Sequence, residues 1–183
     1  MKNLIIAKRY AKALFNIGLE DGLVEQYGQE LEGFVTLLKE MPALEDAITN
    51  PLYPEDARRQ VLNAVADKAG LSRTVKSFLG LMVEKKRAAY LGEVLEYFRK
   101  LADAHNNVAR AKVAAAGKLD DEALKSITDT LAKITGKTVV VEFSRDPELI
   151  GGVVARIGDL VIYGSVRTQL QSIKESLKRG ELS

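Results

Sequence analysis

The sequence of 183 residues contains no cysteine and no tryptophan, and it has one histidine and four prolines. Without cysteine, disulfides, thiolate catalysis, zinc–thiolate sites and iron–sulfur clusters are excluded. His105 alone cannot supply a histidine-rich metal site, and it leaves little room for a Ser-His-Asp triad. These absences argue against an enzyme and predict that the protein holds no metal and no cofactor.

The chain also lacks a large charge excess and a long hydrophobic run. It has 27 Lys plus Arg against 25 Asp plus Glu, a smaller basic excess than phosphate-neutralising nucleic-acid binders normally carry. No apolar stretch approaches the ~18–20 residues of a membrane-spanning helix, and the apolar stretch at the N-terminus is too short for a signal peptide. A hydrophobic share of 46% still permits a globular core, so the composition predicts a soluble protein of a reducing compartment.

Helical periodicity extends over the first part of the chain. Apolar residues recur at helical spacing from residue 4 to about residue 108, and glycines and prolines interrupt them. The connections are short, which indicates neighbouring helices packed antiparallel in a bundle. Six helices are predicted, at residues 4–20, 23–41, 43–49, 54–69, 72–86 and 90–106.

The pattern changes after Asn106 and Asn107, because strand-like runs now alternate with helical stripes. We therefore predict an α + α+β protein with a six-helix bundle at residues 1–107 and a small α+β domain at residues 108–183. The second domain has the order strand, helix, three strands, helix. Its elements are predicted at residues 108–116, 120–135, 138–144, 153–157, 160–163 and from Ser165 onward.

Three features of the sequence could suggest a chemical site. His105 lies where the sixth helix ends, and a cationic histidine is favourable there. The Asp120-Asp121-Glu122 cluster fits the first turn of a helix, so it needs no metal to explain it. Gly151-Gly152 is not followed by the Gly-Lys-Ser/Thr of a phosphate loop, and we expect Gly152 to be structural, with positive φ or a close backbone approach.

The first and fifth helices have wider apolar arcs than the outside of a bundle requires. Each arc spans about 200°, whereas a surface helix needs only about 100°. Two interpretations remain open: both helices are central in the bundle, or their excess edges form a groove for the amphipathic helix of a partner. The candidates for such a groove are Ile6, Tyr10, Ala13, Leu14, Ile17, Phe78, Leu81 and Met82.

Two segments carry a family resemblance that extends over essentially the whole chain. Residues 7–15 (AKRYAKALF) resemble the opening of the delta subunit of bacterial F-type ATP synthases, a family that includes the mitochondrial oligomycin-sensitivity-conferring protein. The second segment runs from residue 141 to residue 167, and its order and spacing resemble the family signature closely. The signature positions are Asp146, Ile150, Gly151, Gly152, Arg156, Gly158, Asp159, Gly164, Ser165 and Arg167.

The resemblance implies a non-catalytic stator subunit. Its first and fifth helices would bind the N-termini of the alpha subunits, and its C-terminal domain would meet the C-termini of the b-subunit stalk. It would hold the catalytic head against the rotor, so that proton transport is coupled to ATP synthesis. The resemblance and the missing presequence predict a bacterial protein on the cytoplasmic face of the cell membrane, bound to the membrane only through its partners and not to nucleic acid.

Two departures and one alternative accompany this resemblance. The family often has an acidic residue at the position of Tyr163 and a basic residue at that of Gln169, which weakens any charged contact at these positions. The alternative is an RNA-binding module, because a strand-helix-strand unit with a Gly-Gly turn could contact RNA. The small net charge and the absence of a GxxG loop count against it.

Overall fold

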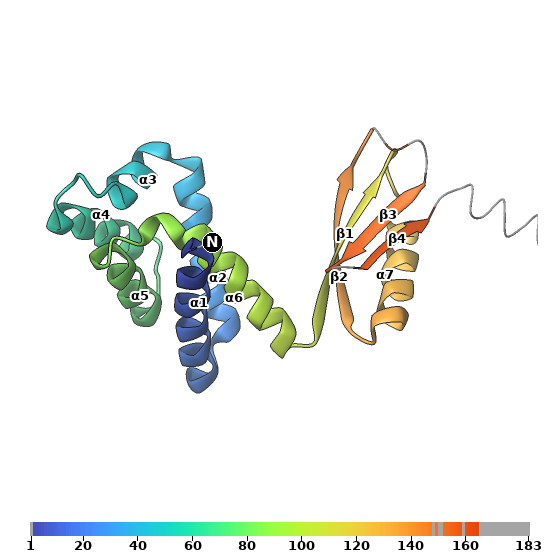
Figure 1. Ribbon diagram of the computed structural model, residues 1–183, viewed down its shortest axis with the longest axis horizontal. Coiled ribbons are helices and arrows are strands. Elements are labelled where there is room, and N and C mark those ends of the chain that lie inside the picture. The colour runs from blue at the N-terminus through green and yellow to red at the C-terminus, as the bar shows by residue number, and fades with distance from the viewer. Residues whose placement is uncertain (1, 148, 150–151, 159, 165–183) are drawn as a thin grey trace, which may run out of the picture. The chain divides into compact units, whose positions relative to one another are not determined.

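The computed structural model describes residues 2–147, 149, 152–158 and 160–164. The chain divides into two compact units, Met1–Ala102 and Asp103–Ser183, and each is described by itself. Both are seen as ribbons in Figure 1. The helix predicted from Ser165 onward lies outside the described residues.

The first unit is a bundle of helices, as the periodicity predicted. Proline positions decide two helix starts, because Pro42 occupies the first turn of its helix and Pro54 precedes the next helix as its N-cap. The sequence pattern predicts Pro54 inside the first turn of that helix, one position later than the N-cap that it occupies. The elements are α1 (Lys2–Asp21), α2 (Val24–Glu40), α3 (Pro42–Thr49), α4 (Glu55–Lys68), α5 (Arg73–Glu84), the 3-10 turn η1 (Ala88–Tyr90) and α6 (Leu91–His105). The end of α6, from Asp103 onward, belongs to the second unit.

The core of this unit takes one apolar stripe from each helix. Phe15 and Phe98 meet edge to face within it, with ring centroids 6.0 Å apart. One charged side chain lies among these apolar neighbours: Arg58 on α4 is 1% exposed, and its Nε and Nη1 find no hydrogen-bond partner among the described residues. The fully buried members include Leu14, Leu31, Ile48, Leu79, Met82 and Val94.

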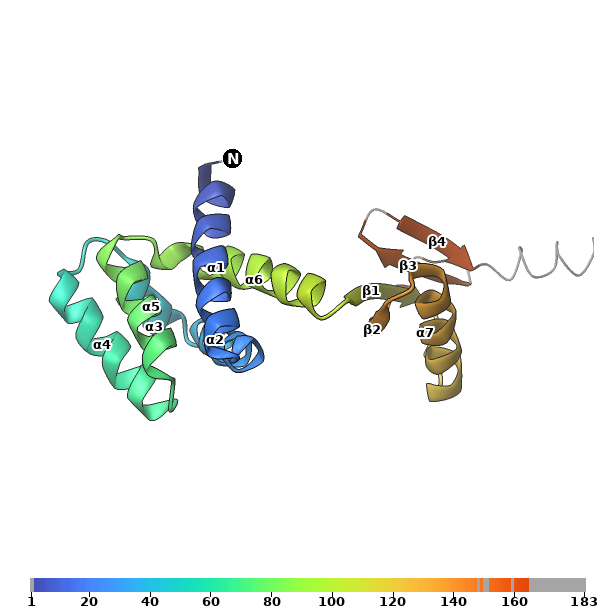
Figure 2. The same ribbon diagram turned by 90° about the horizontal axis from the view of Figure 1, so that it is seen from below.

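The second unit is a four-stranded sheet with a helix on one face (Figure 2). The strand order is β2-β1-β3-β4, with β1 parallel to β2 and the other neighbouring pairs antiparallel. A crossover helix joins the two parallel strands, as parallel pairing requires. The elements are β1 (Val108–Ala115), α7 (Asp121–Thr135), β2 (Thr138–Arg145), β3 (Val153–Ile157) and β4 (Leu160–Gly164).

Both ends of α7 follow from local chemistry. Asp120 is its N-cap, since its Oδ1 accepts a hydrogen bond from the Ala123 amide at 2.7 Å. Gly136 ends the helix in the left-handed conformation, at φ 67°. Asp121 and Glu122 lie in the first turn of α7, where acidic side chains are favourable.

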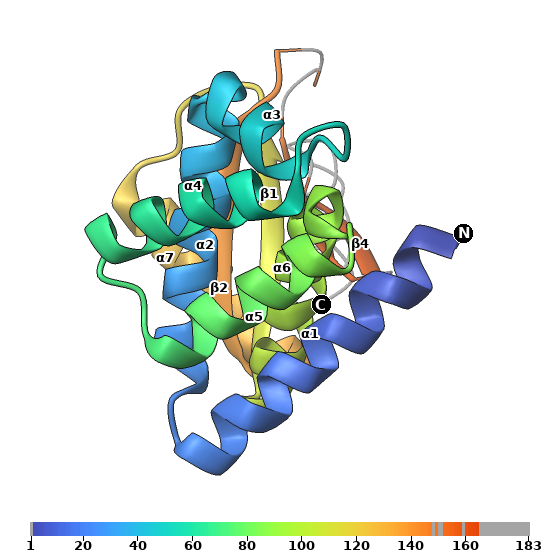
Figure 3. The same cartoon turned by 90° about the vertical axis from the view of Figure 1, so that its left-hand side faces the viewer.

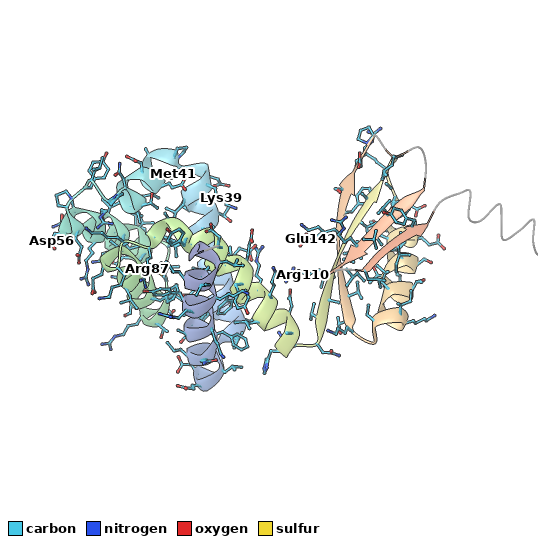
Figure 4. The ribbon with its side chains drawn as sticks, in the orientation of Figure 1. Lys39, Met41, Asp56, Arg87, Arg110 and Glu142 are labelled. Carbon is cyan, nitrogen blue, oxygen red and sulfur yellow. The ribbon has the colours of Figure 1, made fainter. Side chains whose placement is uncertain are left out.

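The strand register collects apolar side chains on the face of the sheet against which α7 packs. A helix of 10–12 Å diameter covers about two strands spaced 4.8 Å apart, so one helix cannot cover four. The opposite face carries charged residues, including Arg110 and Glu142, whose side chains approach to 3.9 Å (Figure 4). The apolar face holds Ala111, Val113, Ala115, Val139, Val141, Val153, Ala155, Ile157 and Ile162.

Candidate partner-binding groove

An open groove of about 610 Å³ runs between α1 and α5. The two helices lie side by side in Figures 1 and 3, and Tyr10 of α1 meets Phe78 of α5 edge to face at 6.2 Å between ring centroids. The groove is mostly apolar, with basic and hydroxyl side chains among its lining. It is lined by Arg9, Tyr10, Ala13, Ile17, Arg73, Thr74, Ser77, Phe78 and Leu81.

The wide apolar arcs divide between the core and this groove. On α1, Ala7 and Ala11 are buried in the core, whereas Ile17 is 40% exposed on the groove side. On α5, Leu79 is buried and Leu81 is 41% exposed. The excess apolar edges therefore face solvent, and a fully central position for the two helices is contradicted.

The structure brings together five of the eight candidate groove residues: Tyr10, Ala13, Ile17, Phe78 and Leu81.

The other three candidates lie elsewhere. Ile6 is half-buried and does not line the groove. Leu14 and Met82 were wrong as groove residues, because both are fully buried in the core. A helical wheel places them beside the exposed edge, but the packing of neighbouring helices decides where the covered arc ends.

Four lining residues were missed: Arg9, Arg73, Thr74 and Ser77. A signal existed for two of them, because Arg73 and Ser77 precede the candidate Leu81 at i+4 spacing on α5. The predicted groove was drawn from the apolar arcs alone, so the polar members of that row were left out.

Tyr27 of α2 fixes one end of the groove. Its hydroxyl donates a hydrogen bond to Asp21 Oδ2 at 2.6 Å, at the end of α1, and lies 3.1 Å from the Thr74 hydroxyl in the first turn of α5. The bond to Asp21 raises the pKa of Tyr27 above its ordinary value, because ionisation would lose the donated proton beside a carboxylate. The phenol thus remains a donor at neutral pH and connects three helices.

Arg87 fixes the other end (Figure 4). Its Nη1 donates to the Tyr10 hydroxyl at 2.7 Å, and its guanidinium carbon lies 5.4 Å from the centroid of the same ring. The Tyr10 ring is therefore held between Arg87 and Phe78. Both contacts pre-form the groove, which lowers the conformational cost of binding a partner.

The second unit has a smaller apolar groove of about 330 Å³, beside α7 and over β3 and β4. It lies over the part of the apolar sheet face that α7 does not cover. Ile134 of α7 is 56% exposed at this groove. The lining is Ser126, Ile127, Thr130, Leu131, Ile134, Val153, Ala155 and Ile162.

The described signature residues support the β-hairpin and its approach. Gly152 has φ 89°, so the expected positive φ is confirmed, and Gly158 has φ 56° in the turn between β3 and β4. Arg156 pairs with Val161 across the hairpin, and Gly164 ends β4 opposite Val153. Asp146 directly follows β2, and its amide donates to the Ala115 carbonyl at 3.0 Å. Ile150, Gly151, Asp159, Ser165 and Arg167 lie outside the described residues.

The described part of the chain contains no group of three or more histidine, aspartate or glutamate residues arranged to hold a metal ion. Within the same residues, no helix is both long enough and apolar enough to cross a bilayer.

Comparison with known proteins gives a consistent result over the full length. The family model described as ATP synthase delta (OSCP) subunit matches residues 6–177. ATP synthase subunit delta of Syntrophobacter fumaroxidans is 53% identical over 182 residues, with all of both chains covered. The corresponding subunit of Desulfosudis oleivorans is 49% identical, with 99% of both chains covered.

The chain belongs to the ATP synthase delta (OSCP) subunit family.

Solved structures support the fold. A chain of the Toxoplasma gondii mitochondrial ATP synthase hexamer superimposes with a TM-score of 0.67 at 22% identity, covering 93% of this chain and 96% of that one. A chain of the Polytomella F-ATP synthase gives a TM-score of 0.51 at 22% identity, covering 54% of this chain and 87% of its own.

Family membership makes this delta-family chain a structural subunit of ATP synthase, and not a catalytic one. Its role is that of a stator subunit that links the catalytic head to the peripheral stalk. That role favours the stator-subunit interpretation of the sequence over an RNA-binding module.

Proposed function

We propose that the α1–α5 groove binds the N-terminal helix of an alpha subunit of the ATP synthase head. The observation that carries this proposal is the exposed apolar edge shared by the two helices. Ile17 and Leu81 keep about two-fifths of their surface exposed along the groove, although apolar side chains favour burial. An amphipathic partner helix would cover both edges at once.

Ala13 makes a close approach of that helix possible. It is exposed and lies between Tyr10 and Ile17 on the groove side of α1. Its single methyl group leaves room for a partner backbone, while Tyr10 adds apolar area with a hydroxyl near the edge. The groove thus offers a small central residue with larger apolar side chains on both sides.

The domain at residues 108–183 contacts the C-terminal part of the b-subunit stalk in this proposal. The apolar groove beside α7 supports the assignment, because it offers a second surface in a unit separate from the alpha site. The helical domain, residues 1–107, binds the head and the second domain binds the stalk. The chain then resists rotation of the head while proton flow drives the rotor, on the cytoplasmic face of the membrane and through its partners.

The test is titration of a synthetic peptide, the N-terminal 25 or so residues of the same organism's alpha subunit, into full-length wild type and Ala13→Asp. We expect at least a roughly 30-fold weaker dissociation constant for Ala13→Asp, because a carboxylate would enter a desolvated apolar contact. Circular dichroism and thermal unfolding check the fold.

Asn16→Asp is the matched control. It adds the same charge to an exposed position of α1 that does not line the groove, so its affinity should stay within twofold of wild type. Equal affinities of wild type and a folded Ala13→Asp protein would remove this groove as the alpha-subunit site.

A further inference from the structure

Two arginines of the groove carry charges that no described residue of the protein compensates. Arg9 of α1 and Arg73 of α5 both line the groove, and both are exposed. Among the described residues, neither side chain takes part in a hydrogen bond, an ion pair or a ring contact. Their charges therefore face the groove without a counter-ion from the part of the chain that the structure describes.

Four cations near the groove differ from these two, because each has a partner. Lys76 pairs with Asp67 at 2.6 Å, Arg59 with Glu55 at 3.7 Å and Lys85 with Glu84 at 2.7 Å. Arg87 is bound to the Tyr10 hydroxyl. Asp67, Glu55 and Glu84 are thus already engaged, and Asp21 accepts the Tyr27 hydrogen bond.

The two arginines mark opposite ends of the groove. Asp21, at the C-terminus of α1, and Thr74, in the first turn of α5, share the Tyr27 hydroxyl, so Arg73 lies at the Ile17 end. Arg87, which follows α5, contacts Tyr10, so Arg9 lies near the C-terminus of α5. The two helices are therefore antiparallel along the groove.

This arrangement sets a spacing for a partner. Arg9 and Ile17 are eight positions apart on α1, which corresponds to roughly 12 Å of helix at 1.5 Å per residue. A second helix that lies along the groove covers the same length in about two turns. Guanidinium groups at both ends favour carboxylates and disfavour lysine or arginine there.

We propose that Arg9 and Arg73 select an acidic amphipathic helix. The partner helix carries an Asp or Glu on the flank of its apolar stripe near each end, about two turns apart, and each carboxylate pairs with one arginine. The apolar groove supplies affinity, and the two arginines determine which helices are accepted and in which register. This inference rests on the proposed function, since it concerns the same groove.

The first experiment uses the alpha-subunit peptide with full-length wild type, Arg9→Gln, Arg73→Gln and the double variant. Exposed ion pairs contribute little individually, so we expect about a three- to fivefold loss of affinity per arginine and about tenfold or more for the pair at low salt. At roughly 0.5 M salt the differences should fall below twofold, because such charges are screened. Lys39→Gln, which removes an exposed charge outside the groove at the end of α2 (Figure 4), should match wild type.

The second experiment does not depend on the alpha sequence. Two designed helical peptides share one apolar stripe, and one has Glu and the other Lys at the two flanking positions. Wild type should bind the Glu peptide more tightly than the Lys peptide by tenfold or more, and Arg9→Glu/Arg73→Glu should reverse the order.

The outcomes separate this inference from the proposed function. If wild type binds the alpha peptide but the arginine variants bind equally well at low salt, the charge selection is wrong and the groove assignment stands. If wild type does not bind the alpha peptide, the proposed function fails, and the designed peptides still decide the charge selection. Equal binding of the Glu and Lys peptides overturns it.

Discussion

Arg58 and Gly152 are two single residues that affect the stability of this chain, one through a buried charge and the other through its backbone conformation. Arg58 places a guanidinium group inside the helical unit without a hydrogen-bond partner for Nε and Nη1 among the described residues. Gly152 adopts a backbone conformation that is unfavourable for a residue with a Cβ atom. The sequence indicated the positive φ of Gly152 but not the burial of Arg58, and both features have measurable consequences.

Replacing Arg58 with methionine should stabilise the protein by roughly 1–3 kcal/mol, because a buried charge without a partner costs more than an apolar side chain of similar length. The measurement is the free energy of unfolding in urea. Arg59→Met is the control, since Arg59 is exposed and only weakly paired with Glu55, and it should change stability by less than about 0.5 kcal/mol. A destabilised Arg58→Met protein would show that this guanidinium is compensated.

Gly152→Ala should destabilise the second unit by about 1–2 kcal/mol, because alanine at φ 89° is strained. Gly117→Ala provides the comparison. Gly117 has open space around its Cβ position and does not have a positive φ, so the substitution should be nearly neutral. Thermal unfolding of both variants measures the difference, and equal melting temperatures would contradict the backbone argument.

At the scale of elements, α1, α5 and α7 are each only partly covered by their own unit. The inner stripes of α1 and α5 enter the core, and their outer edges line the larger groove. α7 packs on one part of an apolar sheet face and leaves the smaller groove over β3 and β4. In both units, the uncovered apolar surface lies beside a helix.

Ile134→Glu tests the surface beside α7. Ile134 is exposed, so the unfolding free energy should change by less than about 1 kcal/mol, whereas affinity for a C-terminal fragment of the b subunit should fall tenfold or more. Surface plasmon resonance with the immobilised fragment is a suitable measurement. Lys133→Glu is the control. It changes the net charge more than Ile134→Glu does, at an exposed neighbouring position that does not line the groove, and it should bind the fragment normally. Normal binding by Ile134→Glu would place the stalk contact elsewhere.

At the scale of the whole molecule, the division into Met1–Ala102 and Asp103–Ser183 gives each unit its own hydrophobic core. Two separate cores are the physical condition for two units that fold independently. The proposed assignment of head binding to one domain and stalk binding to the other uses this separation.

Residues 1–106 expressed alone should therefore fold. We expect a strongly helical circular-dichroism spectrum and a single cooperative thermal transition. The reason is that Phe98 is the last buried residue of the bundle core along the described chain, so the fragment keeps all of them. Residues 1–83, which lack η1 and α6, are the comparison and should not unfold cooperatively, since Val94 and Phe98 would be lost from the core. A fragment 1–106 without a near-ultraviolet signal would contradict the independence of the units.

Much of this architecture could be predicted from the sequence, because its signals are local. Ser72 and Asp120 cap helices through bonds to amides three residues away, and glycines end helices by taking positive φ. The change from helical to alternating periodicity marks the second domain, and the signature around Gly152 and Gly158 indicates the family. These properties depend on neighbours a few positions apart, which the sequence displays directly.

Only the tertiary structure decided which part of each apolar arc is covered. Leu14 and Ile17 are both apolar members of the α1 arc, yet the first is buried and the second lines the groove. The arrangement of Arg9 and Arg73 at opposite ends likewise depends on α1 and α5 being antiparallel neighbours. Periodicity reports the angle of a side chain around its own helix, whereas exposure depends on helices distant in the sequence, whose packing no local pattern contains.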